Sequence, residues 1–230
     1  MCLRFKNPAW SQGLSWERRR TAGQHFMDKS LTKRALRKAS TRAAVIDAAR
    51  DVFKARGYEG ATIAEIAKSA GVSAGTVLNA APTKISLLND VMVTDFEALA
   101  LDCQALAGSL TSSYRDKVAA LLELHLQRHC DELELIAALL GHTWLEGGEE
   151  FESLYRNLGR AWAPILTLTR EHKEAGGFRE GVEPEALVTL LQDVYIGVIR
   201  RYSAHGDHDL IAASTAMRAG LDMVFDGATA

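Results

Sequence analysis

Proline, cysteine and long apolar stretches are all scarce in this chain of 230 residues. Its four prolines leave long segments free of the residue that most strongly interrupts helices. The chain is 47% apolar and shows almost no alternation of apolar and polar positions, which favours an all-α fold. No apolar run approaches the roughly 18 residues of a membrane span, and the N-terminus lacks the apolar core of a signal peptide. We therefore expect a cytoplasmic protein without a membrane partner.

Features typical of disulfide-linked, metal-binding or catalytic proteins are also missing. The three cysteines form no Cys-x-x-Cys pair, which argues against a disulfide framework and a thiolate zinc site. They are Cys2, Cys103 and Cys130. The sequence has no nucleophile elbow, phosphate-binding loop or dinucleotide fingerprint, so we expect neither enzymatic activity nor a cofactor. His125, His129 and His142 could bind a metal ion, but no His-Glu-x-x-His motif supports this, and we expect no metal site.

The net charge is only −2, but the charges are unevenly distributed. Residues 1–42 contain eleven Lys and Arg against two acidic residues, so the rest of the chain is acidic. Basic charge gathered at one end is what phosphate neutralisation by a nucleic-acid-binding protein requires. Residues 1–26 lack helical periodicity and could equally be a solvated tail, and Met27 is a candidate alternative start. The basic segment 30–40 could extend the first helix, form an arm along a DNA groove, or be a solvated face.

Three short helical patterns and two diagnostic turns follow within residues 42–84. Residues 42–56 carry apolar side chains at helical spacing, and Gly57 ends that helix. A second helix starts at Thr62, where Thr62 and Glu65 have the spacing of a capping box. Gly71-Val72-Ser73 then predicts a tight turn between helices, with a glycine that tolerates positive φ, an apolar corner residue and a hydroxyl cap. The third helix, residues 74–79, begins with small residues that permit a close approach to DNA.

The order and spacing of these residues resemble the tetracycline-repressor-like (TetR) family of transcriptional regulators. The residues that carry the resemblance are Thr41-Arg42, Ala48-Ala49, Phe53, Gly57-Tyr58, Ala61-Thr62, Ile66-Ala67, Ala70-Gly71-Val72-Ser73, Gly75-Thr76, Pro82-Thr83-Lys84 and Leu87-Leu88. The resemblance implies an N-terminal three-helix DNA-binding domain followed by a helical effector-binding and dimerisation domain. We place these domains at residues 41–86 and 87–230, after a basic, flexible extension at residues 1–40.

The resemblance also implies which residues contact double-stranded DNA. The expected set is Arg42, Thr62, Ser73, Ala74, Gly75, Thr76, Leu78, Asn79 and Lys84. Thr62 and Ser73 would present donors to phosphates, and Lys84 would meet the DNA backbone from the next helix. Gly75 and Thr76 would face base edges, and Asn79 could read an adenine. Leu78 and Ala81 depart from the family, which usually has aromatic residues at these two positions.

Long helical patterns follow Lys84, and the first of them, over residues 83–107, would link the DNA-binding end to the second domain. Aromatic residues of this domain could line an apolar cavity for a small-molecule effector, with His125 or Gln127 as a polar group. The expected ligand-binding residues are Phe96, His125, Trp144, Phe151, Tyr155, Trp162 and Tyr195. Each of these side chains could instead be an ordinary core residue.

The last two helical patterns have broad apolar faces, more than one domain needs to cover. They resemble the family's dimer interface, in which two helices from each subunit form a four-helix bundle. The expected interface residues are Leu187, Leu191, Val194, Val198, Leu221 and Val224. An intramolecular core is the alternative for these faces.

Together these patterns predict a ligand-responsive, homodimeric repressor that binds a palindromic operator. By the family's mechanism, the effector would move the helix at residues 83–107 and so change the separation of the two recognition helices. The regulatory sign is open, since a helix-turn-helix fixes binding and not repression. The competing prediction is a helical protein that binds a small molecule or a protein partner and has a degenerate DNA-binding head. Leu78, Ala80 and Ala81 motivate that alternative.

Overall fold

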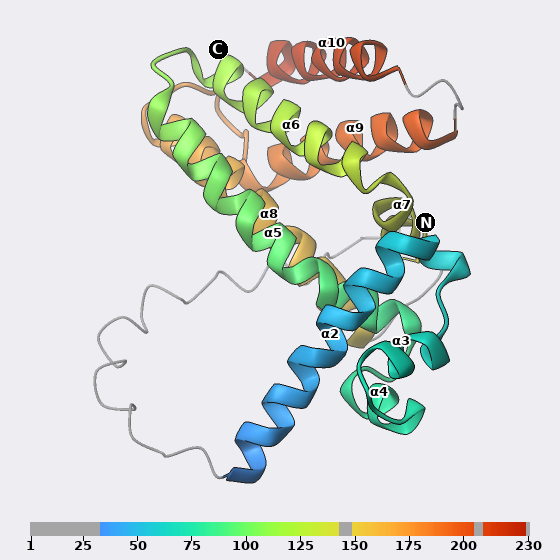
Figure 1. The fold of residues 1–230 in the computed structure, drawn as a ribbon. Helices are drawn as coiled ribbons and strands as arrows, with labels where there is room; N and C mark the ends of the chain where they lie inside the picture. The colour runs from blue at the N-terminus through green and yellow to red at the C-terminus, as the bar shows by residue number, and fades with distance from the viewer. Residues whose placement is uncertain (1–32, 143–148, 205–208, 229–230) are drawn as a thin grey trace, which may run out of the picture.

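The computed structural model describes residues 33–142, 149–204 and 209–228, and it confirms the expected all-α fold. The predictions for residues 1–26, Met27 and Trp144 lie outside the described residues. Helices α2 (Lys33–Gly60), α3 (Ile63–Ser69) and α4 (Ala74–Ala80) form one end of the molecule. Figure 1 shows the N-terminal half of α2, in blue, projecting beyond the body on the same side as α3 and α4.

Helix α2 begins earlier than the helical pattern of residues 42–56 predicts. The stretch from residue 33 to residue 56 contains no proline or glycine and is rich in Ala, Lys and Arg, which are strong helix formers. The expectation of a flexible extension is therefore wrong for residues 33–40, which are the first turns of α2. Gly57 interrupts the helix as expected, with φ 69° and ψ 177°, a left-handed conformation that favours glycine.

Helix α5 (Lys84–Ser109) runs from the end formed by α2, α3 and α4 into the second domain and packs along α8 (Glu149–Glu174), as Figure 1 shows. It starts at a capping box, because Thr83 Oγ1 accepts from Ser86 N at 3.1 Å and Ser86 Oγ accepts from Thr83 N at 3.0 Å. Its apolar stripe is buried along most of its length. The predicted connecting helix is therefore present, and α8 covers it.

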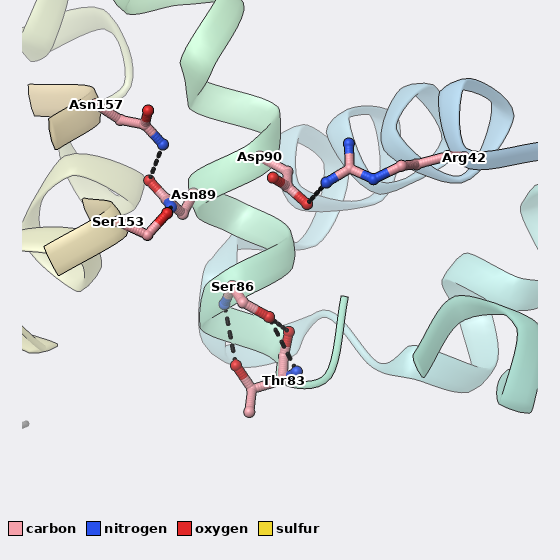
Figure 2. A network of polar contacts seen from close by, with 7 residues as sticks. All are labelled: Arg42, Thr83, Ser86, Asn89, Asp90, Ser153 and Asn157. Atoms are coloured by element: carbon pink, nitrogen blue, oxygen red, sulfur yellow. Dashed lines mark hydrogen bonds and ion pairs between the residues drawn. The ribbon is translucent and has the colours of Figure 1, made fainter. Parts of the chain in front are cut away.

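A small polar network joins α5 to its neighbours (Figure 2). Asn157 Nδ2 of α8 donates to Asn89 Oδ1 of α5 at 3.0 Å, and Asn89 Nδ2 donates to Ser153 Oγ at 3.4 Å. Both asparagines are buried, so sliding α5 along α8 would leave amide groups without partners. At the next residue, Asp90 accepts from Arg42 of α2 at 2.6 Å. The network fixes the register of α5 against α8.

Helices α6 (Tyr114–Asp131), α7 (Leu133–His142), α9 (Pro184–Ala204) and α10 (Leu210–Ala228) complete the second domain. In Figure 1 α6, α9 and α10 gather at the end away from α3 and α4, and α7 lies beside the end of α2. One continuous apolar core extends from Val45 to Ala228, so the end formed by α2, α3 and α4 is packed together with the second domain. Within the described ranges, none of the helices has both the length and the apolar composition needed to cross a bilayer.

Candidate functional site

Helix α3 has the start that the sequence predicts. Glu65 N donates to Thr62 Oγ1 at 3.2 Å, and Thr62 N donates to Glu65 Oε2 at 3.2 Å, which completes the capping box. Thr62 Oγ1 also donates to the same carboxylate oxygen at 2.9 Å. The Thr62 hydroxyl is thus committed within the cap, although the residue itself is exposed.

The turn between α3 and α4 is formed by Gly71, Val72 and Ser73. Gly71 has φ 66°, and Val72 N donates to Ala67 O at 3.0 Å, so the chain reverses just after α3. Ser73 caps α4, because Thr76 N donates to Ser73 Oγ at 3.1 Å. Val77 is fully buried and anchors α4 to the rest of this end of the molecule. The structure therefore contains a compact helix-turn-helix.

The outer face of α4 consists of small and polar side chains with one apolar exception. Ser73, Ala74, Gly75 and Asn79 are exposed, whereas Thr76 is half-buried and its hydroxyl lies 2.9 Å from Ser73 Oγ. Leu78 is 45% exposed on this helix. Ala81 is buried and belongs to the core rather than to the surface. The face can approach another molecule closely, but Leu78 brings no polar group to it.

Lys84 does not extend outward as predicted. Its ammonium Nζ donates to Tyr58 O at 2.8 Å, lies 3.4 Å from Ala61 O, and sits 4.3 Å from the centroid of the Tyr58 ring. These contacts engage carbonyl groups at and just after the end of α2. Lys84 therefore holds the α2–α3 connection against the start of α5, and a contact between its ammonium and the DNA backbone would compete with these internal contacts.

The projecting part of α2 carries the basic charge. Lys33, Arg34, Arg37 and Lys38 are all exposed, and no acidic residue occurs within residues 33–46. Arg42 pairs with Asp90 at 2.6 Å, while eight residues further along α2 Arg50 pairs with Asp95 at 2.6 Å. Both pairs lie where α2 and α5 cross in Figure 1. The basic turns of α2 before Arg42 project beyond this crossing, away from the second domain.

The end of α2 is also fastened to α7. Tyr58 N donates to Glu134 Oε1 at 2.8 Å, and Tyr58 Oη lies 3.5 Å from His142 Nε2. A Cβ atom at Gly57 would fall 2.2 Å from Glu134 Oε1, so only glycine permits this close approach. Helix α7 thus holds the last residues of α2 through a side chain at each of its two ends.

Two cavities lie between α5, α6, α7, α8 and α9. The larger has a volume of about 150 Å³ and the smaller about 50 Å³, and His129 and Ile136 line both. The larger is also lined by Phe96, Arg128 and three carboxylates, from Asp95, Asp131 and Glu132. Among the described residues, the smaller has no charged side chain in its lining, which includes Leu140, Tyr155, Leu158, Trp162, Gln192 and Tyr195. The second domain therefore has space beside α7, and the larger cavity opens to the surface, since exposed residues such as Arg128 and Asp131 line it.

Two buried histidines distinguish this region. Burial lowers the pKa of His129 to about 4 and, together with the neighbouring His129, lowers the pKa of His125 to about 3. His129 Nδ1 lies 2.7 Å from Tyr195 Oη, but His129 Nε2 and both ring nitrogens of His125 make no hydrogen bond within the described structure. The Ala161 backbone lies near the His125 ring and acts in the opposite direction, raising its pKa, although the contact does not meet hydrogen-bond geometry. Both rings are therefore neutral at physiological pH.

The structure brings together four of the expected ligand-binding residues. Tyr155, Trp162 and Tyr195 line the smaller cavity, and Phe96 lines the larger. His125 touches the rings of Trp162 and Tyr195 but lines neither cavity. Gln127 lies in a surface groove between α6 and α10, so it is not a polar group of the interior. Phe151 is in α8, and its side chain, like Trp144, lies outside the described residues.

His129, Ile136, Leu140 and Gln192 line the cavities but were not predicted to bind a ligand. The spacing of His129 from His125, one helical turn, indicates a shared helix face, which is the only signal for His129 in the sequence. Among the described residues, no group of three His, Cys, Asp or Glu side chains is placed to bind a metal ion. His142 instead contacts Tyr58, at the other end of α7.

Most of the expected dimer residues face the interior of their own chain. Leu187, Leu191, Val198 and Leu221 are at most 5% exposed, so they form the intramolecular core that was the alternative. The prediction that this apolar face is buried is correct, but side chains of the same chain bury it, not those of a second copy. Val194 and Val224 are half-buried, and the ideal Cβ position at Gly220 lies 2.7 Å from Val194 Cγ1. Exposed apolar side chains on these two helices include Leu190 and Met223.

These features define a helix-turn-helix protein with an all-helical second domain. Residues 45–91 match the family model for bacterial regulatory proteins of the tetR family. The chain therefore carries the DNA-binding domain of tetR-family transcriptional regulators, in that family's fold, and the resemblance drawn from the sequence is confirmed.

Solved structures share the fold over most of the chain. FadR from Thermus thermophilus, a TetR-family transcriptional repressor in complex with lauroyl-CoA, is 21% identical with a TM-score of 0.72, and the match covers 81% of this chain and 94% of that one. FadR from Bacillus subtilis in complex with stearoyl-CoA is 19% identical with a TM-score of 0.63, covering 80% and 98%. RolR in complex with resorcinol is 21% identical with a TM-score of 0.63, covering 83% and 95%. No curated protein matches the sequence.

Proposed function

We propose that this protein is a homodimeric, ligand-responsive repressor that binds a palindromic DNA operator. The observation that carries the proposal is the compact α3–turn–α4 unit, in which Val77 anchors α4 while its outer face stays exposed. A two-fold dimer presents two such faces, and a palindrome presents two matching half-sites about 34–36 Å apart.

Base reading is assigned to the exposed face of α4. Ala74 and Gly75 have side chains small enough for the helix to enter the major groove closely, and Asn79 carries an amide that can pair with an adenine. Thr76 offers its hydroxyl at the edge of this face, next to Ser73. Thr62 and Ser73 hold the two helix starts in position through their hydroxyl groups, and these two exposed residues bring the helix N-termini to phosphates.

Phosphate neutralisation is assigned to the projecting turns of α2 in place of Lys84. At a rise of 1.5 Å per residue, Lys38 lies about 6 Å and Arg34 about 12 Å beyond Arg42 along α2. These turns project from the end of the molecule where α3 and α4 lie (Figure 1). They form a basic helical arm at that end. Such an arm adds sequence-independent affinity.

The dimer face is assigned to the apolar side chains that α9 and α10 leave uncovered. Val194 packs against Gly220 at the α9–α10 seam, and Leu190 lies one turn before Val194 on the same side of α9. Met223 is 73% exposed and Leu190 is 48% exposed. Two copies of this seam would bury these side chains in a four-helix arrangement, which an isolated chain leaves in water.

Effector binding is assigned to the two cavities. Helix α7 connects these cavities to the end of the molecule formed by α2, α3 and α4. Ile136 and Leu140 of α7 form part of the cavity wall, whereas Glu134 and His142 of the same helix hold Tyr58. A ligand larger than the cavities must displace α7 or its neighbours, because the space is too small. That displacement changes the hold on the end of α2 and, through Lys84, the start of α5. The ligands of the neighbouring structures, acyl-CoA thioesters and resorcinol, support a ligand-binding second domain.

The test is sequence-specific binding to the DNA upstream of the protein's own gene. Titrations on that DNA and on a scrambled duplex, over several salt concentrations, separate base contacts from phosphate contacts. We expect a preference for the native sequence, and we expect Thr76→Ala to relax it at one position per half-site by about 1 kcal/mol. Lys84→Ala serves as a control, since its ammonium is bonded internally: the salt slope should stay the same.

The second candidate is a helical small-molecule-binding or partner-binding protein with a degenerate DNA-binding head. The observation that favours it is Leu78, which is 45% exposed on α4 and cannot donate a hydrogen bond to a phosphate. Equal affinity of the wild-type protein for native and scrambled DNA would support this candidate and reject the repressor. Leu78→Tyr should tighten DNA binding without altering sequence preference if the repressor assignment is right.

A further inference from the structure

The pairing of His129 with Tyr195 determines which proton His129 carries. The ring is neutral, so one nitrogen has a hydrogen and the other accepts. If Tyr195 donates its hydroxyl hydrogen to His129 Nδ1, only the Nε2–H group remains unpaired. If Nδ1 donated instead, both the Tyr195 hydroxyl hydrogen and the Nε2 lone pair would lack partners, because Tyr195 makes no other hydrogen bond among the described residues. The first arrangement leaves fewer buried groups unsatisfied, so Nε2 carries the hydrogen.

His129, which carries this unpaired donor, borders both cavities. The residue is only 8% exposed and is part of both linings. Nearly all buried donors in proteins have an acceptor, so a buried N–H group beside two cavities indicates a missing partner. His125 is equally unsatisfied but lines neither cavity, so it provides a matched comparison on the same helix.

The charges around the cavities select against an anion. Three carboxylates line the larger cavity, and each nearby cation is already paired: Arg50 with Asp95, Lys54 with Glu132, and Arg128 with Asp102. None of the described residues that line the smaller cavity is charged. A carboxylate or phosphate entering here would lose water without gaining a free cation.

We infer that the effector is an uncharged, mostly apolar molecule with a hydrogen-bond acceptor, such as a carbonyl oxygen, that accepts from His129 Nε2–H. The inference rests on the proposed ligand-responsive function and names the ligand class of that same site. A cavity of about 150 Å³ holds a group the size of one aromatic ring, and Phe96 in its lining suits such a group. An effector of greater size occupies the smaller cavity as well, across Ile136, which lines both.

The experiment measures binding of matched probes to the full-length chain without DNA, by isothermal titration calorimetry. Acetophenone has the carbonyl acceptor, ethylbenzene has nearly the same shape without it, and benzoate adds the negative charge. Lauroyl-CoA, below its micellar concentration, tests the ligand class found in the FadR neighbour. We expect acetophenone to bind roughly tenfold more tightly than ethylbenzene, the usual effect of one hydrogen bond in a dry site, and benzoate and lauroyl-CoA to bind more weakly than acetophenone.

Two variants locate the contact. His129→Leu should abolish the preference of acetophenone over ethylbenzene, whereas His125→Leu, one turn away, should preserve it. Nitrogen-15 NMR of labelled histidine gives a second readout, since acetophenone should shift the His129 Nε2 resonance and leave that of His125 in place. A preference that survives His129→Leu, tighter binding of benzoate or lauroyl-CoA, or no binding of acetophenone at millimolar concentration would overturn the inference. DNA binding without a probe tests the regulator assignment separately, so the two failures are distinguishable.

Discussion

The two buried histidines should make the stability of this protein fall sharply in mildly acidic solution. In the unfolded chain each histidine titrates with a pKa near the ordinary 6.5, whereas burial lowers the pKa to about 3 for His125 and about 4 for His129. At a pH between the unfolded and folded values, the two histidines are protonated in the unfolded chain but stay neutral in the folded protein. The stabilisation is therefore complete above pH 6.5 and is lost as the pH falls below it.

The size of the loss follows from the number of protons. Between pH 7.5 and pH 5.5, each histidine lowers the free energy of unfolding by about 1.4 kcal/mol, so the pair lowers it by about 2.7 kcal/mol. That is a large share of a typical stability of roughly 5–15 kcal/mol. This window lies above the ordinary pKa values of aspartate and glutamate, so carboxylate titration contributes little to it.

Urea unfolding at pH 7.5, 6.5 and 5.5, at one protein concentration, measures this slope. His125→Leu should remove about half of the pH dependence without lowering stability at pH 7.5, because neither nitrogen of His125 makes a hydrogen bond. His129→Leu should also remove half, but at a cost of about 1–3 kcal/mol at every pH, since Tyr195 Oη loses its partner. An unfolding free energy that stays constant from pH 7.5 to 5.5 would refute the assignment of both rings as buried and neutral.

Three further predictions concern other parts of the molecule. Gly57→Ala should destabilise the protein by about 1–3 kcal/mol in thermal or urea unfolding, because φ is 69° and the added Cβ atom would meet Glu134. The control is Gly108→Ala, at a helical position with open space around it, which should be neutral or slightly stabilising. Met223→Asp should convert the dimer to a folded monomer in sedimentation experiments, since this side chain is 73% exposed in the single chain, and a wild-type monomer at micromolar concentration would reject the dimer. Replacing both Arg34 and Lys38 with Gln should weaken binding to all DNA sequences alike. It should also reduce the slope of log affinity against log salt concentration by about two, and an unchanged slope would show that this arm does not touch phosphates.

The sequence by itself determined the local structure of this protein. The capping box at Thr62, the turn at Gly71 and the break at Gly57 depend on residues close together in the chain, so their chemistry is readable without tertiary information. The same short-range spacings carried the family resemblance, which the match over residues 45–91 confirms. Helical periodicity also identified the apolar stripes of α5 and α9.

Only the tertiary structure decided what each face and each charge meets. Periodicity shows that Leu187 and Leu221 belong to apolar faces, but it cannot distinguish burial inside one chain from burial against a second copy. The ammonium of Lys84 found acceptors on Tyr58, which is 26 residues earlier in the chain, and no local pattern encodes such a contact. Likewise, His129 faces two cavities because α7, α8 and α9 surround it. Contacts between distant segments depend on how whole helices pack, and the sequence specifies that packing only through all of them together.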